Sequence, residues 1–539
     1  MASVIVSLDC RNSNVSPPVT APGAFGAPCF FSRGEHTFAV PLAFHATNRA
    51  ALLARLGPLS GLAVFRGGDA RERFDTDHEE LFRQESYFQY LFGVKEPGWW
   101  GVIDVETGEA TLLMPQLAPE YAVWMGRIET CAEASLRYGV RVVYVSQLGA
   151  IVAKAASVFV MKGVNSDSGT DISDVLPVKP TLLDAGVSAS IVDESPLLFQ
   201  ALAEARVHKS SEELNLLAYV SYVSSLAHVT VMRSVKAGDY EYQLEARFLA
   251  ACSESGGCRN CAYTAICACG PNSAVLHYGH AGAPNDKRLS EGDVTLLDMG
   301  AEYHCYASDI TCSFPVRGTF DADQRMVYEG VLAAQKNVLG AMKPGASWAD
   351  MHLLAEKTIL DHLVSGGVLV GAIDDLVAAG IGAVFLPCGL GHFIGLDTHD
   401  VGGYLPANPP RSERNGLKKL RTARVLAENM VLTVEPGIYF IDALLDPATA
   451  EGAPTRKFFD LDRLADFRGF GGVRLEDVVA VTENGVENYT LCPRTCDEVE
   501  AVMRGEQWPP ATDAAPYMFR KWTTLVDSAL VPLTLSQSE

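Results

Sequence analysis

The sequence predicts two units, the second of them with an α+β fold, and two observations carry this prediction. The chain of 539 residues exceeds the roughly 100–200 residues of a single domain, and the motifs described below divide it at about residue 190. Beyond that point, helix signals alternate with short strand-like runs that end in acidic residues. Helices and strands mixed in this way are typical of an α+β domain.

Two helices are expected after the boundary. The first begins near Ser210, because Ser210 and Glu213 have the spacing of a capping box ahead of an apolar face. The second covers about 322–342 and is ended by a lysine-proline-glycine turn at 343–345. Apolar residues at helical spacing mark its buried face: Val327, Val331, Ala334 and Val338.

Two expected strands carry aspartates. Asp298 closes the apolar run 294–297, and Asp309 lies within the alternating run 305–314. A short antiparallel pair of these strands would bring the two carboxylates together.

Three further segments each present one side chain that can bind a metal. Glu435 ends the apolar run 431–434, and the proline-glycine turn that follows stops the strand and exposes this last side chain. The two-residue period of a strand places Arg474 and Glu476 on one face, so the arginine can steady the carboxylate. His392 lies among glycines that permit close backbone approach to an ion.

These four carboxylates and one imidazole predict a hydrolytic site with two metal ions. Oxygen-rich donors favour Mn²⁺ or a similar divalent ion over the thiolate-rich surroundings of structural zinc. Two ions roughly 3.5–4 Å apart can share the five side chains and hold a water that ionises near neutral pH. Each residue alone has another interpretation, since an aspartate at a strand end is more often a turn residue.

Longer stretches around these residues strongly resemble the eukaryotic prolidases, the Xaa-Pro dipeptidases of the pita-bread metallopeptidases. The resemblance extends from about residue 35 to 505. The matching stretches are LFRQESYF at 81–88, GVNSDSG at 163–169, LHYGHAGAPND at 276–286, LDMG at 297–300, SDIT at 308–311, HFIGLDTHDVGGY at 392–404, VEPGIYF at 434–440 and VRLED at 473–477.

The resemblance implies a specific architecture. It implies a smaller α/β domain at 35–190, similar to the N-terminal domain of aminopeptidase P, and a pita-bread domain with a curved antiparallel sheet backed by helices at 191–506. We expect a flexible tail at 1–34, where proline, serine, alanine and glycine are frequent, and a C-terminal extension at 507–539. The family also implies a homodimer.

The resemblance further implies a role for each site residue. Asp298 would chelate one ion, His392 and Glu435 the other, and Asp309 and Glu476 would bridge the two. Glu435 would also be the proton shuttle, which takes a proton from the attacking hydroxide and passes it to the leaving proline nitrogen.

Substrate contacts are also implied by the family. His277 and His399 would contact the scissile carbonyl and its oxyanion, and Arg421 would clamp the free carboxylate of a dipeptide, for which its planar fork of donors is suited. Arg474 is a further residue expected to contribute to substrate binding.

One departure from the family leaves alternatives open. The family usually has a histidine four positions before His392, whereas this chain has Cys388, and a thiol cannot carry a proton at neutral pH as imidazole does. Two outcomes follow: a working prolidase with altered rate or specificity, or a protein of impaired turnover, which at the extreme is a non-catalytic binding protein. An Xaa-Pro aminopeptidase acting on longer peptides is a separate alternative, which Arg421 disfavours. The five metal-binding residues disfavour a hydrolase of the metal-free creatinase type.

Composition bears on partners and location. A net charge of −22 argues against nucleic acid or an anionic membrane as a partner. No secretory signal or membrane span is expected. The thirteen cysteines, an odd number, fit a reducing compartment, which we take to be the cytoplasm. Cys258 and Cys261, with Cys267 and Cys269, lack the spacing of a zinc ribbon and are expected to pack near the floor of the active site; a redox switch at Cys258 and Cys261 is the alternative.

Overall fold

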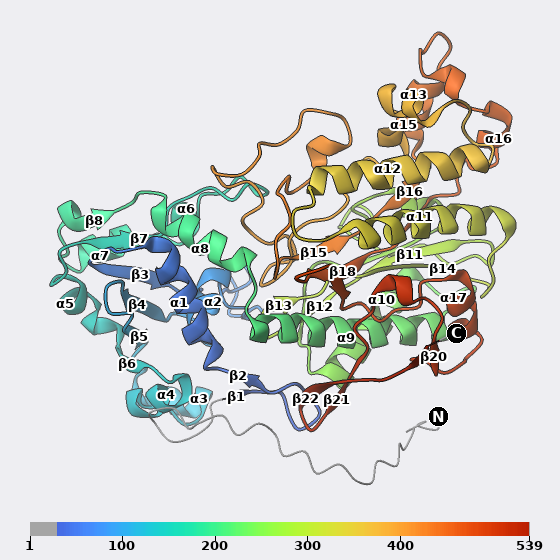
Figure 1. The fold of residues 1–539 in the computed structure, drawn as a ribbon. Helices are drawn as coiled ribbons and strands as arrows, with labels where there is room; N and C mark the ends of the chain where they lie inside the picture. Colours follow the sequence, from blue (N-terminus) through green and yellow to red (C-terminus); the bar gives the residue numbers. More distant parts are fainter. Residues whose placement is uncertain (1–29, 538–539) are drawn as a thin grey trace.

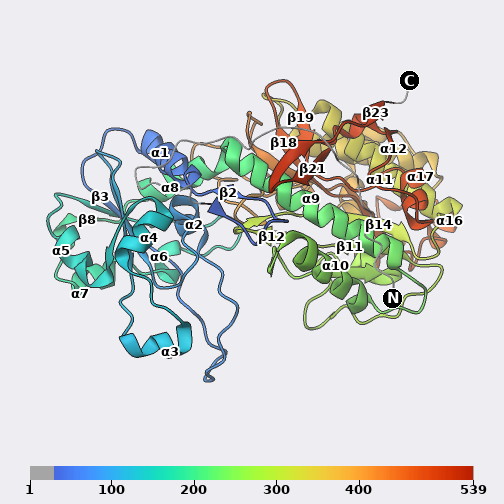
Figure 2. The ribbon, with the colours of Figure 1, turned by 90° about the horizontal axis from the view of Figure 1, so that it is seen from below.

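The computed structural model describes residues 30–537, which form two units side by side (Figures 1 and 2). The smaller unit, at the left of Figure 1, contains most of the described chain up to about Val207, and the larger unit contains the chain from there onward. The expected flexible tail lies almost entirely outside the described residues.

The smaller unit is an α/β layer structure, as the resemblance implies. Its six-stranded sheet has the order β6-β5-β4-β3-β7-β8, in which β3 pairs antiparallel with β4 and parallel with β7. The strands are β3 (Leu62–Arg66), β4 (Trp100–Asp104), β5 (Ala110–Met114), β6 (Arg141–Tyr144), β7 (Val158–Val160) and β8 (Val192–Asp193). The surrounding helices are α1 (Phe44–Leu56), α2 (Ser86–Phe92), α3 (Ala122–Met125), α4 (Cys131–Tyr138), α5 (Leu148–Val152), α6 (Ile172–Val175), α7 (Lys179–Asp184) and α8 (Leu197–Val207).

The larger unit has antiparallel sheets between layers of helices, which is the α+β arrangement expected. One sheet has the order β10-β11-β14, a second β15-β18-β19, and β16 and β17 form a separate pair, in which β17 contacts β11 and β14. Helices α11 and α12 pack together on one side, and α9 and α10 pack together on the other (Figure 1).

The elements of the larger unit are bounded as follows. The helices are α9 (Ser211–Ser234), α10 (Glu241–Gly256), α11 (Ala322–Ala341), α12 (Trp348–Ser365), α13 (Ile373–Ala378), α14 (Gly382–Phe385), α15 (Asp442–Thr449), α16 (Leu461–Ala465) and α17 (Cys496–Met503). The main strands are β9 (Asn260–Cys261), β10 (Ile266–Cys269), β11 (Val294–Asp298), β12 (Ala301–Tyr303), β13 (Tyr306–Ala307), β14 (Thr311–Pro315), β15 (Val431–Val434), β16 (Gly437–Tyr439), β17 (Gly472–Arg474), β18 (Asp477–Val481) and β19 (Val486–Asn488).

Both predicted helices are present. Helix α9 begins with the expected capping box, in which Ser210 and Glu213 exchange hydrogen bonds. Helix α11 buries the four residues expected on its apolar face. By length and composition α9 could cross a membrane, but 72% of its most apolar window is buried within the fold. Packing against the rest of the protein therefore accounts for its composition.

The expected strand at 305–314 is interrupted. Strand β13 pairs with β12, whereas β14 pairs with β11, so the chain changes partner sheets between Ala307 and Thr311. Ser308 holds this crossing, because its hydroxyl accepts a hydrogen bond from the Ala301 N–H at 3.1 Å. Asp309 consequently lies between two strands, and its side chain faces the interior.

The C-terminal segment is folded onto the larger unit. Arg520 is buried and forms ion pairs with Glu498 at 2.7 Å and with Asp513 at 2.9 Å. A hairpin of β21 (Thr523–Val526) and β22 (Ala529–Pro532) follows, and its turn reaches the start of the described chain, where the Ser528 carbonyl accepts a hydrogen bond from Ala39 N–H at 2.9 Å. Strands β1 (Phe30–Phe31) and β2 (Val40–Pro41) lie beside this turn in Figure 1.

Candidate metal centre and substrate cavity

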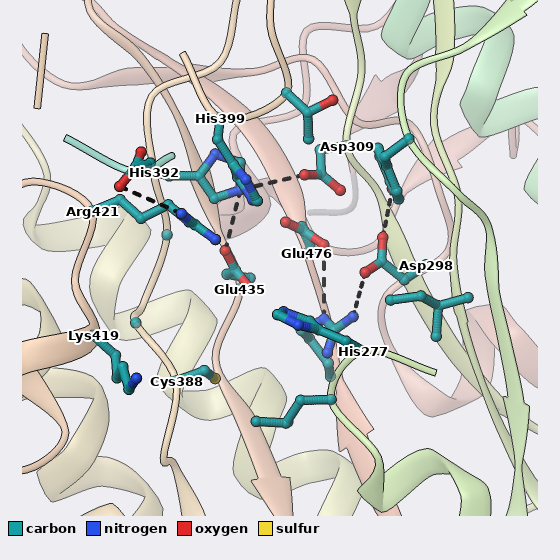
Figure 3. Close-up of a pocket in the computed structure, with 18 of the residues that line it drawn as sticks. His277, Asp298, Asp309, Cys388, His392, His399, Lys419, Arg421, Glu435 and Glu476 are labelled. Carbon is teal, nitrogen blue, oxygen red and sulfur yellow. Dashed lines mark hydrogen bonds and ion pairs between the residues drawn. The ribbon is translucent and has the colours of Figure 1, made fainter. Parts of the chain in front are cut away.

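All the predicted site residues line one cavity of about 1120 Å³ in the larger unit (Figure 3). They are Asp298, Asp309, His392, Glu435, Glu476, His277, His399, Arg421, Arg474 and Cys388. Strands β11, β14, β15 and β17 have one end at this cavity. Predicted site residues as far apart in the sequence as His277 and Glu476, which are 199 positions apart, therefore meet in one place.

The metal-binding side chains converge on His392. Asp309, His392 and Glu476 offer ligand atoms that lie within 4.8 Å of one another. His392 Nε2 is 3.3 Å from Asp309 Oδ2 and 3.5 Å from Glu435 Oε1 (Figure 3). The Nδ1 atom lies 3.0 Å from the Phe393 carbonyl oxygen, to which it donates, so Nε2 is the nitrogen aimed at the carboxylates.

Backbone contacts hold His392 beside Glu435. A Cβ atom on Gly391 would lie 2.0 Å from the Thr433 carbonyl oxygen, so only glycine permits this approach of the loop to β15. The Thr433 hydroxyl accepts a hydrogen bond from His392 N–H at 3.0 Å and donates to Glu435 Oε1 at 3.2 Å. Thr433 thus links the backbone of His392 to the side chain of Glu435, a function that its place in an apolar run did not indicate.

Arg474 contacts Asp298 more closely than the expected Glu476. Its Nη2 lies 2.5 Å from Asp298 Oδ2, whereas its Nε lies 3.8 Å from Glu476 Oε2. Further donors of the same guanidinium bond the Thr311 hydroxyl at 2.9 Å and the Tyr439 hydroxyl at 2.8 Å. Because these neighbours occupy its donors, Arg474 serves mainly to steady the carboxylates.

Hydroxyl groups orient two further carboxylate oxygens of the cluster. Tyr263 donates to Asp298 Oδ1 at 2.5 Å, and Thr311 donates to Glu476 Oε2 at 2.7 Å. Thr311 follows Asp309 in the matching stretch, whereas Tyr263 lies outside every stretch that pointed to the site.

The electrostatics of the cluster call for additional positive charge. Burial and the neighbouring carboxylates raise the pKa of Asp298 to about 7 and raise the pKa values of Glu435 and Glu476. Burial is the largest influence on Asp309 and acts to raise its pKa, but the hydrogen bond to His392, the charge of His392 and the hydrogen bond to Tyr263 together outweigh burial and lower the pKa of this carboxyl. Asp309 Oδ1 is buried without a hydrogen-bond partner among the described residues. An unpaired acceptor within an oxygen-rich set fits a divalent cation.

The two other histidines line the same cavity as neutral bases. The His399 ring stands perpendicular to that of His392, with ring centroids 4.5 Å apart. Burial and the charge of His392 lower the pKa of His399 to about 3, and burial and Arg421 lower the pKa of His277. A neutral imidazole keeps one N–H to donate, which suits contact with a carbonyl or an oxyanion.

Arg421 lies across the cavity and contacts the smaller unit. Its Nη1 is 3.4 Å from Asp167 Oδ1, and Arg411 Nη2 is 3.6 Å from the same oxygen. Asp167 lies in the stretch 163–169 that resembles the family, but the sequence assigned it no function. The smaller unit therefore contributes a carboxylate to the cavity.

Cys388 also lines the cavity. Burial and the charge of Glu435 raise the pKa of its thiol to about 12, so it is uncharged at neutral pH. Of the other cysteines discussed, Cys267 and Cys269 are buried in β10 beside β11, and Cys258 is buried while Cys261 is exposed. Within residues 30–537, the side chains that lie close enough together to share a metal ion are Asp309, His392 and Glu476, and none of them is a cysteine.

Comparison with known proteins decides the family. The model of metallopeptidase family M24 matches residues 216–483, and that of the aminopeptidase P N-terminal domain matches residues 45–159. The chain is 48% identical to the Xaa-Pro dipeptidase of Homo sapiens over 483 residues, which cover 88% of this chain and 96% of that protein. This chain belongs to metallopeptidase family M24. As a member of that family it is a hydrolase that uses divalent metal ions.

Two further relatives of this M24 metallopeptidase are aminopeptidases. A probable Xaa-Pro aminopeptidase of Verticillium alfalfae is 36% identical over 446 residues, or 82% of this chain and 92% of that protein. The structure of Pseudomonas aeruginosa aminopeptidase PepP superposes with a TM-score of 0.70 and 31% identity, covering 86% of this chain and 98% of that one. These matches confirm the expected combination of an α/β N-terminal domain and a pita-bread domain.

Proposed function

We propose that this M24 metallopeptidase hydrolyses Xaa-Pro dipeptides. The observation that carries the proposal is the placement of Arg421 in the same cavity as the carboxylate cluster and the two neutral histidines. A guanidinium at this place can bind the free carboxylate of a dipeptide while the scissile bond lies at the cluster. The 48% identity to a protein named Xaa-Pro dipeptidase supports the same substrate class.

Five side chains would hold two divalent ions, and we propose Mn²⁺ from their oxygen-rich chemistry. Asp298 would bind one ion, His392 with Glu435 would bind the other, and Asp309 and Glu476 would contribute to both; all five side chains line the cavity. When bound, such ions supply an ionised water at neutral pH and polarise the scissile carbonyl.

Glu435 would carry the proton that the leaving group needs. The proline nitrogen leaves as a secondary amine, so it must gain a proton as its bond to the carbonyl carbon breaks. The carboxyl of Glu435 has a pKa raised by burial and is held at Oε1 by Thr433 and beside His392. A carboxyl of raised pKa is suited to accept a proton and then to release it.

His277, His399 and Arg421 would orient the dipeptide. The two neutral imidazoles would donate hydrogen bonds to the carbonyl oxygen and to the negative charge that develops on it. Arg421 would exchange part of its contact with Asp167 for the carboxylate of the substrate. Together these contacts fix the scissile bond against the carboxylate cluster.

An Xaa-Pro aminopeptidase acting on longer peptides is the second candidate, because solved aminopeptidase structures share the fold. Hydrolysis of Gly-Pro and of Gly-Pro-Gly by metal-free protein given back Mn²⁺ distinguishes the two, with Glu435→Gln as a control for contaminating peptidase. We expect cleavage of Gly-Pro that depends on both Mn²⁺ and Glu435. Cleavage of the tripeptide alone would favour the aminopeptidase. Binding of two ions without turnover would favour the non-catalytic protein, and Cys388→His would then test that position.

We also infer a cytoplasmic homodimer that binds neither nucleic acid nor membrane. The free thiols of the cysteines described in residues 30–537 support a reducing compartment, and the charge of −22 disfavours polyanions. A cluster of exposed apolar side chains on α3 supports a protein interface: Val123, Trp124 and Met125. Sedimentation velocity tests the dimer, since a species of one chain mass at micromolar concentration would refute it.

A further inference from the structure

One side of the cavity carries an excess of positive charge. Four basic residues from a single segment line it, and we call them the cationic wall: Arg411, Lys418, Lys419 and Arg421. Figure 3 shows Arg421 and Lys419 on the same side of the cavity, opposite Asp298 and Asp309. In a protein of net charge −22, such a wall would concentrate anionic substrates at this opening.

Three of these cations already have partners. Arg411 and Arg421 share Asp167, at 3.6 Å and 3.4 Å. Lys418 Nζ donates to the Asn415 side-chain oxygen at 2.8 Å. The ammonium of Lys419 differs, since no described residue forms an ion pair or a hydrogen bond with it, although it lines the cavity.

In Figure 3, Lys419 lies below Arg421, on the side of Cys388. It closes the 3-10 turn Leu417–Lys419, and a Cβ atom on Gly389 would lie 3.1 Å from its carbonyl oxygen. The two segments therefore touch next to Cys388 (Figure 3). The thiol of Cys388 is uncharged, and the ammonium of Lys419, which lines the cavity without a partner among the described residues, can supply a positive charge to a ligand here.

We propose that Lys419 is a specificity-determining residue that binds a second carboxylate of the substrate. The inference rests on the proposed function, in which Arg421 holds the carboxylate of the proline. The ammonium of a lysine, on its flexible side chain, can bind a carboxylate over a range of positions, whereas the planar guanidinium of an arginine requires one orientation of the carboxylate. In a dipeptide this second carboxylate is the side chain of an acidic first residue, as in Glu-Pro. In a longer peptide, whose proline has no free carboxylate, Lys419 would bind the C-terminal carboxylate instead.

The test compares substrates that differ in one charge. Specificity constants, kcat/KM, are measured for Glu-Pro against Gln-Pro, and for Gly-Pro-Gly against its C-terminal amide, with Gly-Pro as the reference. The proteins are the unchanged chain, Lys419→Gln, Lys419→Arg and Lys418→Gln, all loaded with Mn²⁺. Lys418 is the matched control because it is the adjacent lysine and its ammonium is already held by Asn415.

We expect the unchanged protein to favour the charged member of one pair by about two- to five-fold, the range of a solvent-accessible ion pair. Lys419→Gln should abolish that preference, whereas Lys419→Arg and Lys418→Gln should keep it. The preference should also weaken at high salt. The pair affected identifies the source of the carboxylate, either the first side chain or the chain end.

The inference is overturned if Lys419→Gln leaves the charged-to-neutral ratio of both pairs unchanged, or if Lys418→Gln changes a ratio as much. Failure of the proposed function is distinct, because the unchanged protein would then not cleave Gly-Pro. Retention of the fold in each variant is checked by its thermal unfolding midpoint.

Discussion

The two sides of the cavity are built in different ways. One side is formed by strand ends, and we call it the carboxylate wall: Asp298, Asp309, Glu435 and Glu476, with Arg474 behind them. Nearly all of these side chains are buried, and most have a hydrogen bond to a neighbouring hydroxyl group. The cationic wall comes from the segment between Tyr404 and Leu426, which has one 3-10 turn and several exposed side chains. The buried wall is organised for chemistry that tolerates little movement, and the exposed wall for contacts that vary with substrate.

The difference follows from where charge is buried. Carboxylates removed from water require fixed partners, and strands supply them in register. Cations that remain in water keep their charge without partners and can be replaced at little cost to folding. We therefore expect substitutions in the carboxylate wall to change turnover or stability, and substitutions in the cationic wall to change substrate preference.

The largest effect is expected from Glu435→Gln. Loss of the proton carrier should lower kcat for Gly-Pro by about 10²–10⁴-fold, because general acid-base catalysis contributes that much. The amide keeps the size of the side chain and its contact with Thr433. Single-turnover rates and thermal unfolding of the same preparation provide the measurement, and a fall of less than about ten-fold would remove Glu435 from the proton transfer.

The second prediction concerns the buried arginine. Arg474→Met should destabilise the metal-free protein by roughly 3–5 kcal/mol, because it leaves Asp298 without its buried counter-charge. Divalent ions should restore part of this stability, since they supply positive charge to the same carboxylates. Urea unfolding with and without Mn²⁺ checks both points, and Arg421→Met is the matched control on the exposed wall. Equal losses in the two variants would break the comparison between the walls.

A third prediction uses a buried pair outside both walls. His45 Nε2 lies 3.2 Å from His304 Nε2 where the two units meet, and burial lowers the pKa of His45 to about 3. Below pH 6.5 the unfolded chain gains a proton that the folded protein cannot accept, so stability falls as the pH decreases toward 3. The loss from this residue between pH 6.5 and 4 should be about 3 kcal/mol.

Urea unfolding of the unchanged protein and of His45→Gln at several pH values isolates this contribution. The variant should lose less stability on acidification, and the difference in stability between the two proteins should become independent of pH above pH 7. Parallel curves over the whole range would show that His45 does not couple folding to protons.

The sequence predicted the carboxylate wall more completely than the cationic wall. Apolar runs ending in Asp298 and Glu435 and the two-residue period at Glu476 indicated the strand ends, and the resemblance supplied the roles. Asp309 was also predicted, but the interruption of its strand was not. The exchange of partner sheets at Ser308 leaves no local signal in the sequence. Arg474 was placed beside Glu476 from strand periodicity alone, and its closer contact with Asp298 depends on the packing of β17 against β11.

The contacts that sequence could not supply join distant segments. Tyr263 and Asp167 reach the site from a loop and from the smaller unit, and neither has a motif that names its partner. The position of Lys419 beside Cys388 likewise depends on a contact between two loops. In contrast, both helices were predictable because capping and apolar spacing act within a few residues.

Arg421 provides the next test of the cationic wall. Arg421→Gln should lower kcat/KM for Gly-Pro by about ten- to a hundred-fold, mainly through KM, because a charge-assisted hydrogen bond to a carboxylate is lost. Arg421→Lys should recover only part, since it keeps the charge without the planar fork. The prolinamide analogue Gly-Pro-NH₂, which has no carboxylate, should be much less affected. Equal losses on the acid and the amide would place Arg421 outside carboxylate binding.

The smallest effect is expected from Asp167→Asn. Asp167 competes with the substrate carboxylate for Arg421, and at 3.4 Å its contact is long for a strong ion pair. Removing its charge should lower KM for Gly-Pro by about two-fold, the range of a weak ion pair. Arg411→Gln is the matched control. It removes the second arginine that shares Asp167, so Asp167 should hold Arg421 more firmly and KM should rise slightly. A raised KM in Asp167→Asn would mean instead that Asp167 orients Arg421, and the smaller unit would then take part in building the cationic wall.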